Sequence, residues 1–275
     1  MNVVVHKLGC DIFSRAGGSL RSNKWLRAEL ITLVFVLSIA SAPKTVALGG
    51  SERAPVVVEL FTSEGCSSCP PADQLLKTLS QSFKAGPEVV VVSEHVDYWD
   101  HLGWKDPFSS RLFTERQYAY ARAFGQSGVY TPEMVVNGAI GFVGTDASRA
   151  LRAITDRSLE PSSKIALSVE RKPGKNELLI RLSDSQFELA SEEQLVILLT
   201  QGASSTQVKA GENSGQVLTH TGVARFVKAF KTISSEPLVI MVPLESKVTS
   251  LRVVAIRQNT KDMRITGSGV AMVSQ

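Results

Sequence analysis

Cysteine is scarce in this 275-residue sequence, which contains only three. Cys10 lies upstream of the apolar run Leu30–Ala40, so a secretory leader ending after that run would leave only Cys66 and Cys69. A single pair argues against the disulfide framework of small secreted domains, and a structural zinc site normally needs four ligands. The scarcity therefore favours dithiol chemistry at these two cysteines, which are separated by two serines.

Clusters of like charge are absent as well. Residues 1–42 contain five of the 30 lysines and arginines and two of the 26 acidic residues, which leaves 25 and 24 and a net charge of +1 in the remainder. No Lys/Arg-rich block and no long low-complexity tract follows the leader. This balance excludes the basic patch expected of a nucleic-acid-binding protein, so we expect no nucleic-acid partner.

The apolar run Leu30–Ala40 is too short to span a membrane, which takes about 20 residues. Lys24 and Arg27 precede the run and small residues follow it, which is typical of a secretory signal peptide. We expect a signal peptide over residues 1–42, cleaved after residue 42 or, as the alternative, after residue 47. Cleavage would give a secreted or periplasmic protein without a transmembrane anchor.

Hydrophobic patterning changes near residue 160. Before it, the apolar runs Val56–Phe61 and Val89–Ser93 are typical of strands covered on both faces, and helical spacing follows each run. Asn137-Gly138 predicts a type I′ turn within a hairpin over Met134–Ile140. These features predict an α/β domain over residues 54–158.

The second half has the period of two that is typical of half-buried strands. A turn-rich linker at Leu159–Ser163 marks the expected boundary, and Gly211–Gly215 is expected to be a loop. Strands are expected at Ile165–Val169, Leu178–Leu182, Leu195–Thr200, Leu238–Leu244, Leu251–Ile256 and Val270–Val273. Several short strands separated by turns predict an all-β, sandwich-like domain over residues 163–275.

Cys66 and Cys69 stand where the strand Val56–Phe61 gives way to a helix. Free N–H groups and the helix dipole favour a thiolate at a helix N-terminus, where the first thiol of such a pair titrates between about 3.5 and 7.5 instead of near 8.5. Cys66 is therefore the expected nucleophile and Cys69 the resolving thiol. Two other interpretations stay open at this stage, an inert disulfide staple and half of a zinc site.

Three stretches, Glu59–Asp73, His95–Asp100 and Tyr130–Gly138, resemble a family of secreted, thioredoxin-like proteins known only as a domain of unknown function. The order of the expected elements is also similar to that of the thioredoxin superfamily. The resemblance implies an α/β thioredoxin-like domain followed by an all-β, sandwich-like C-terminal domain. It implies a dithiol site and supplies no substrate.

The resemblance also implies roles for individual residues. Cys66 and Cys69 correspond to the redox motif and Pro132 to the cis-proline, so that Thr131 would pair with a substrate backbone beside the reactive sulfur. Glu59 would be the buried acid that helps to deprotonate Cys69, although a solvent-facing Glu59 at the strand end is equally compatible with the sequence. The serines between the cysteines depart from the Gly-Pro of thioredoxin, so the redox potential cannot be carried over.

A polar and aromatic segment follows the second strand, at the sheet edge where ligands of open α/β sheets gather. His95 or Asp97 would relay protons to Cys69, and Trp99 with Trp104 would form an apolar shelf for a substrate peptide. The alternative is a hydrogen-bonded loop without such a role.

Together these features predict an extracytoplasmic thiol–disulfide oxidoreductase that uses no cofactor or metal beyond its own dithiol. Its partner would be a protein dithiol or disulfide. One alternative is a copper(I) metallochaperone in which a histidine joins Cys66 and Cys69. The other is a non-catalytic binding module in which the dithiol is a permanent structural disulfide.

Overall fold

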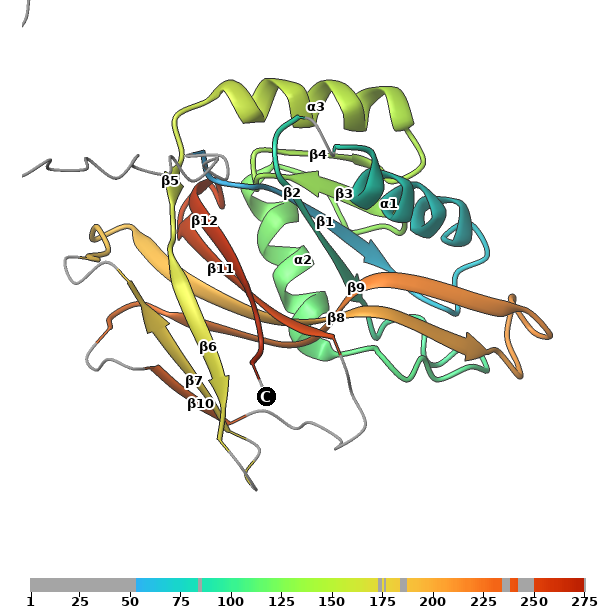
Figure 1. Ribbon diagram of the computed structural model, residues 1–275. Coiled ribbons are helices and arrows are strands. Elements are labelled where there is room, and N and C mark those ends of the chain that lie inside the picture. The colour runs from blue at the N-terminus through green and yellow to red at the C-terminus, as the bar shows by residue number, and fades with distance from the viewer. Residues whose placement is uncertain are drawn as a thin grey trace, which may run out of the picture. The chain divides into compact units, whose positions relative to one another are not determined.

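Twelve strands and three helices make up the part of the chain that the computed structural model describes (Figure 1). This part comprises residues 53–83, 86–172, 175, 177–183, 187–233, 238–241 and 250–274, all within one unit that spans Leu48–Gln275. The expected signal peptide over residues 1–42 and both cleavage positions lie outside it.

Nine of the strands form one mixed sheet in the order β4-β3-β1-β2-β9-β8-β11-β12-β5. Their bounds are β1 Val56–Thr62, β2 Val89–His95, β3 Glu133–Val136, β4 Ile140–Val143, β5 Ser163–Lys164, β8 Glu193–Gln207, β9 Val217–Phe230, β11 Leu251–Asn259 and β12 Ile265–Met272. β1 runs parallel to β2 and antiparallel to β3. β2 in turn pairs in parallel with β9 through Ser93 and Val223, which joins the two halves of the sequence in one sheet.

Helices cover both faces of the N-terminal strands. α1 (Pro70–Ser82) and α3 (Ala147–Leu159) pack on one face, and α2 (Arg111–Ala123) packs on the other, where Phe113 meets Val57 (Figure 1). All seven residues of β1 are buried because this strand is covered on both sides. The nearly continuous apolar sequence of β1 therefore reflects its position between two layers of helix.

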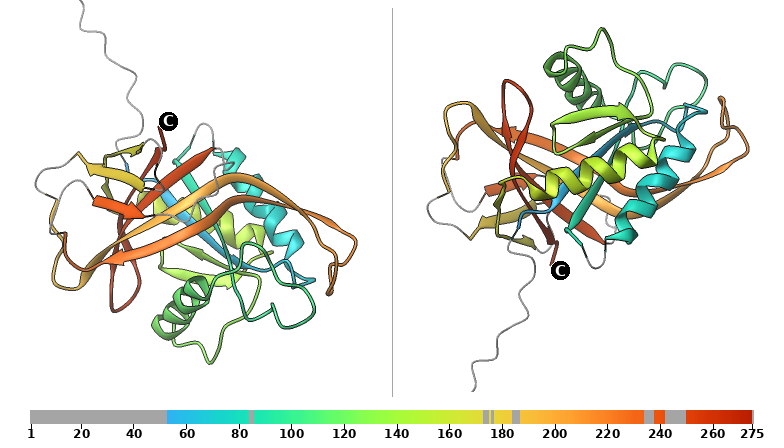
Figure 2. Two further views of the ribbon diagram at one scale, coloured as in Figure 1. Left: turned by 90° about the horizontal axis from the view of Figure 1, so that it is seen from below. Right: turned by 90° about the horizontal axis from the view of Figure 1, so that it is seen from above.

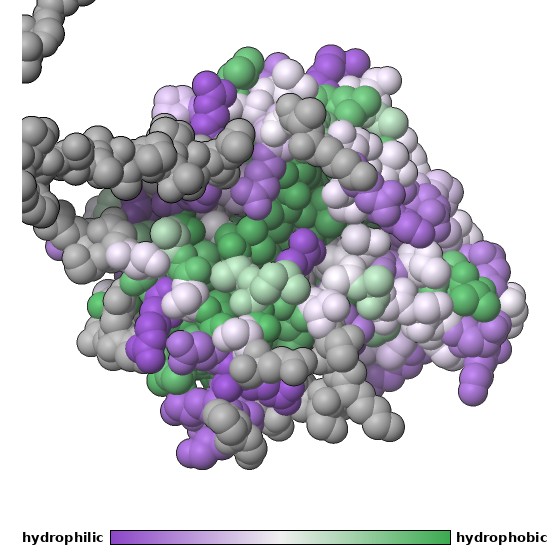
Figure 3. Space-filling model, viewed as in Figure 1, coloured by the Kyte–Doolittle hydropathy of each residue, from purple (hydrophilic) through white to green (hydrophobic). Residues whose placement is uncertain are grey.

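The remaining three strands form a second sheet in the order β10-β7-β6, with β6 Leu167–Arg171, β7 Glu177–Leu182 and β10 Leu238–Met241. Its inner face packs against β8 and β11 in a core that contains Ile180, Ile197 and Val253. Residues 242–244 of the expected strand Leu238–Leu244 lie outside the described residues. Hydrophobic surface gathers in the centre and on the left of the face in Figure 3, over the region where Figure 1 draws β6, β11 and β12.

The expected fold class, an α/β thioredoxin-like domain followed by a separate all-β sandwich, is wrong. The described chain is mostly β, and one nine-stranded mixed sheet crosses the expected linker. The sequence-based assignment contains no strand over Val217–Phe230 and ends the preceding strand at Thr200, whereas β8 continues to Gln207. Because that assignment lacks β9, it offers no strand to pair with the free edge of β2. The N-terminal and C-terminal halves of the sequence therefore looked like two independent domains. The domain boundary itself stays a prediction.

The hairpin expected at Asn137-Gly138 is confirmed. Asn137 and Gly138 have φ angles of 48° and 60° and connect β3 to β4. The Asn137 side chain also accepts a 2.7 Å hydrogen bond from the backbone N–H of Val57. The turn thus reverses the chain direction between β3 and β4, and its Asn137 side chain also holds the start of β1 in place.

β8 and β9 form a long hairpin that extends beyond the rest of the sheet, with its outer half alongside α1 (Figures 1 and 2). We call residues 208–216, which connect the two strands, the hairpin tip. Gln74 of α1 reaches Thr219 of β9 across a 3.5 Å hydrogen bond. The hairpin tip, the carboxyl end of β1 and the start of α1 therefore meet in one place, and the two cysteines lie there.

Candidate dithiol site

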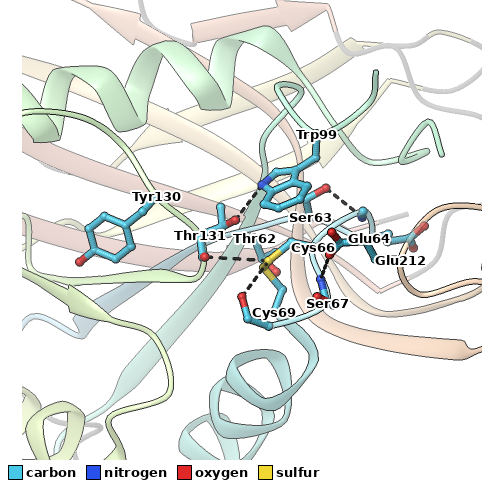
Figure 4. The surroundings of a disulfide bond; sticks show 12 residues. Thr62, Ser63, Glu64, Cys66, Ser67, Cys69, Trp99, Tyr130, Thr131 and Glu212 are labelled. Carbon is cyan, nitrogen blue, oxygen red and sulfur yellow. Dashed lines mark hydrogen bonds between the residues drawn. A yellow bond between two sulfur atoms is a disulfide. The ribbon is translucent and has the colours of Figure 1, made fainter. Parts of the chain in front are cut away.

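Cys66 and Cys69 are joined in a disulfide at the N-terminus of α1 (Figure 4). Cys69 is the N-cap residue, and its carbonyl accepts hydrogen bonds from the backbone N–H groups of Ala72 and Asp73. Both cysteines are fully buried, whereas Ser67 and Ser68 between them are exposed. The expected placement of the pair between a strand and a helix is therefore confirmed.

Thr131 and Pro132 lie directly opposite the disulfide, and the peptide bond between them is cis, as the resemblance implied. The Sγ atom of Cys66 is 3.9 Å from the carbonyl oxygen of Thr131. The indole Nε1 of Trp99 donates a 2.8 Å hydrogen bond to Oγ1 of Thr131 (Figure 4). The structure thus brings together Cys66, Cys69, Thr131, Pro132 and Trp99 from three separate stretches of sequence.

The hairpin tip completes the site with two residues that the sequence analysis missed. The side chain of Asn213 donates hydrogen bonds to the carbonyl oxygens of Glu64, at 2.8 Å, and Cys66, at 3.0 Å. Glu212 accepts a 3.0 Å hydrogen bond from the backbone N–H of Ser67. A turn-rich segment between glycines was visible in the sequence, but nothing local connected it to cysteines about 145 residues away.

A buried charged cluster lies next to the dithiol loop. His220 of β9 stands between Glu64 and Asp73, with its ring nitrogens 3.3 Å from one carboxylate oxygen of each. Burial alone would lower the pKa of His220, but hydrogen bonding to Asp73 and Glu64 raises it to about 9. His220 is therefore an imidazolium at neutral pH. Trp104 adds a 2.9 Å hydrogen bond from Nε1 to Glu64, and the expected substrate shelf of Trp99 and Trp104 stays a prediction.

His95 belongs to this cluster and touches neither cysteine. Its Nδ1 lies 2.6 Å from Oδ2 of Asp106, which also accepts a 2.8 Å hydrogen bond from the backbone N–H of Glu64. Burial raises the pKa of Asp106, but the charge and hydrogen bond of His95 hold it below the usual aspartate value. The His95 and His220 rings meet edge to face at 4.6 Å. A relay from His95 to Cys69 stays a prediction.

Asp97 is hydrogen-bonded to α2. Its carboxylate accepts a 2.6 Å hydrogen bond from Oγ1 of Thr114, and the same hydroxyl accepts a 3.0 Å hydrogen bond from the backbone N–H of Asp97. These contacts fix the segment after β2 to helix α2. These are the contacts of a hydrogen-bonded loop, and a relay role for Asp97 stays a prediction.

Glu59 is completely buried, so a solvent-facing position is wrong. It pairs with Arg116 of α2 at 2.6 Å and accepts a 2.5 Å hydrogen bond from the Tyr120 hydroxyl. Glu94 is 3.4 Å from the same guanidinium, and burial followed by the charge of Glu59 raises the pKa of Glu94 well above its usual value. Glu59 is thus part of a buried network beneath α2, and its expected role toward Cys69 stays a prediction.

Within the described ranges, no group of three or more His, Cys, Asp or Glu side chains has an arrangement that would hold a metal ion. No helix in those ranges is both long and apolar enough to cross a membrane.

Two solved structures resemble the chain. The X-ray crystal structure of a protein from Agrobacterium tumefaciens has 28% sequence identity and a TM-score of 0.59, and the match covers 82% of this chain and 97% of that one. HBP35 of Porphyromonas gingivalis has 14% identity and a TM-score of 0.53, with 82% and 77% coverage, and this likeness concerns the fold alone. No curated protein matches the sequence. Residues 57–258, which include the dithiol, the cis-proline and the hairpin tip, match a family described as "Protein of unknown function (DUF1223)", and the chain belongs to that family.

Proposed function

We propose that this protein is an extracytoplasmic thiol–disulfide oxidoreductase whose redox centre is Cys66–Cys69. The observation that carries the proposal is the placement of the Cys66–Cys69 disulfide at the start of α1 with the Thr131 carbonyl 3.9 Å from Cys66 Sγ. The site is similar in these respects to the dithiol sites of the thioredoxin superfamily. The apolar, basic-flanked leader in the sequence supports export to a compartment where dithiol pairs cycle.

The reduced protein would act through two exchange steps. The Cys66 thiolate attacks one sulfur of a substrate disulfide, a mixed disulfide forms, and the other substrate sulfur leaves as a thiolate. Cys69, after losing its proton, attacks the Cys66 sulfur and releases the second substrate thiolate. Two electrons thereby pass to the substrate and the Cys66–Cys69 disulfide forms. The Thr131 backbone, held by Trp99, would align the substrate chain during the first step.

One observation favours a second candidate, a binding module with a permanent disulfide. Both cysteines are fully buried in the oxidised state, and inert structural disulfides are commonly buried. Copper(I) binding by the two thiols and a histidine is less well supported. The His95 ring instead lies against Asp106 and His220.

The deciding measurement is the reduction potential of Cys66–Cys69 in the mature protein against glutathione buffers. We expect a reversible value between about −120 and −270 mV, together with a mixed disulfide that accumulates in Cys69→Ser. Cys66→Ser is the matched control, because it keeps one thiol but removes the nucleophile. A potential well below about −300 mV with no trapped species would reject the proposal in favour of the structural disulfide.

A further inference from the structure

The hairpin tip is attached to the dithiol loop by a buried residue. Asn213 is 1% exposed, and its amide donates to the carbonyl oxygens on both sides of Gly65. Gly211 and Gly215, with φ angles of 75° and 85°, give the tip the tight bend that brings Asn213 to this position. The tip is therefore anchored to the backbone of the reactive loop itself.

This anchor places a charge beside the nucleophile. Glu212 is exposed, and its Oε2 accepts the backbone N–H of Ser67, the residue that directly follows Cys66 (Figure 4). Hydrogen bonding from the side chain and backbone of Ser67 holds the pKa of the Glu212 carboxyl below the usual glutamate value. Glu212 is therefore ionised at neutral pH, and its carboxylate accepts a hydrogen bond from a backbone N–H group near the start of α1.

The other acids near the loop each have a histidine partner. Glu64 and Asp73 share the His220 imidazolium, and Asp106 faces His95. Glu212 is instead hydrogen-bonded only to uncharged donors of Ser67 among the contacts described for it. Its negative charge therefore opposes the local field of the helix N-terminus, which favours a thiolate.

We infer that Glu212, held in place by Asn213, disfavours the Cys66 thiolate and makes the Cys66–Cys69 pair more reducing. This inference rests on the proposed function and specifies its direction. In the reaction with two glutathione molecules, the Cys66–Cys69 bond breaks and one glutathione disulfide forms. Cys69 ends as a thiol, Cys66 as a thiolate, and one proton passes to solvent. A carboxylate beside Cys66 raises the free energy of this product state and leaves the disulfide state unaffected.

The test compares Glu212→Gln with the wild-type mature protein. The amide keeps the shape of the side chain but removes its charge. We expect a lower Cys66 pKa, measured by thiolate absorbance after chemical reduction, and an equilibrium constant with glutathione shifted toward the dithiol on the order of fivefold. Glu115→Gln is the matched control, because Glu115 is an exposed acid on α2 paired with Arg111 and should leave both values unchanged.

Asn213→Ala tests the anchoring step. Removal of both amide hydrogen bonds should release Glu212 from Ser67, so this variant should shift the Cys66 pKa in the same direction. The double variant with Glu212→Gln should then show no additional shift. Additive shifts would contradict anchoring by Asn213, and the single Glu212→Gln variant keeps the test valid if Asn213→Ala fails to fold.

The outcomes separate this inference from the proposed function. If Glu212→Gln leaves the Cys66 pKa at the wild-type value, or if Glu115→Gln shifts it equally, the inference is overturned even where exchange activity is present. If no mixed disulfide is trapped in Cys69→Ser, the proposed function is rejected, yet the pKa comparison still reports whether Glu212 acts on Cys66.

Discussion

Glu59 and Arg116 form an ion pair of 2.6 Å in which both side chains are withdrawn from solvent. The pair links β1 to α2, and Arg116 also donates to Gln258 of β11 at 3.0 Å. One guanidinium therefore ties together the helical side of the molecule and the C-terminal strands. Two carboxyl groups, Glu59 and Glu94, depend on that single cation.

Arg116→Met should destabilise the fold by about 3–5 kcal/mol, because Glu59 would be left as a buried charge without its partner. Chemical denaturation measures the change. Lys261→Met is the control, since Lys261 forms an exposed pair with Glu192 and such pairs contribute only about 0–1 kcal/mol. Equal losses in the two variants would show that the buried network does not hold the halves together.

The charge of His220 should make stability depend on pH. Because the folded pKa of about 9 lies above the unfolded value of 6.5, the stabilisation is fully present below about pH 6.5 and is lost as the pH rises through 9. A difference of that size corresponds to a loss of up to about 3 kcal/mol in the free energy of unfolding.

Denaturation curves recorded across this pH range measure the effect in wild type and His220→Gln. The variant should be less stable at neutral pH and should lose most of the slope between about pH 6.5 and 9. The exposed His101 serves as the control, because His101→Gln should retain the wild-type slope. A wild-type profile that is flat over this range would contradict a charged His220.

Trp99→Phe and Thr131→Val each remove the 2.8 Å hydrogen bond between the indole and the hydroxyl. Each substitution should lower the free energy of unfolding by about 0.5–1.5 kcal/mol. In a double-mutant cycle the two effects should not add, since both variants lose one shared interaction. Full additivity would mean that the bond does not couple these residues in solution.

Gly222→Ala should disrupt the junction between β2 and β9. Gly222 has a φ of 68°, and an added Cβ would collide with the backbone carbonyl of Val91. We expect a loss of more than about 2 kcal/mol, because strain and a backbone clash act together. Gly215→Ala is the control: its φ is 85°, but nothing lies within 4 Å of the added atom, so its loss should be near 1 kcal/mol.

Local patterns in the sequence were sufficient for the elements around the cysteines. The cis bond before Pro132 was implied by the resemblance to the thioredoxin superfamily and not by a local pattern. Continuous apolar runs identified β1 and β2, and the Asn137-Gly138 pair identified the hairpin turn. Each of these features is encoded within a few neighbouring residues. They could therefore be predicted without knowledge of the complete fold.

The features that were missed depend on distant pairing. β9 begins Val217-Leu218-Thr219-His220, where polar residues interrupt the hydrophobic pattern because His220 faces Glu64 and Asp73 instead of an apolar core. The side chains of Asn213 and Glu212 bond to backbone groups that lie almost 150 residues earlier in the chain. The position of Glu59 was left open for the same reason, since its cation comes from Arg116 on another element. Such contacts follow from topology, which periodicity alone does not specify.

The long sequence separation between Ser67 and Glu212 has a consequence for biosynthesis. Chains emerge from the ribosome with the N-terminus first, so the cysteines leave it well before the segment that later contacts them. Contacts of such high sequence separation also form late, because their chain-closure cost must first be overcome. The nascent chain therefore passes through an interval in which Cys66 and Cys69 lack the contact of their loop with Glu212, and their surroundings are complete only when the β8–β9 hairpin is in place.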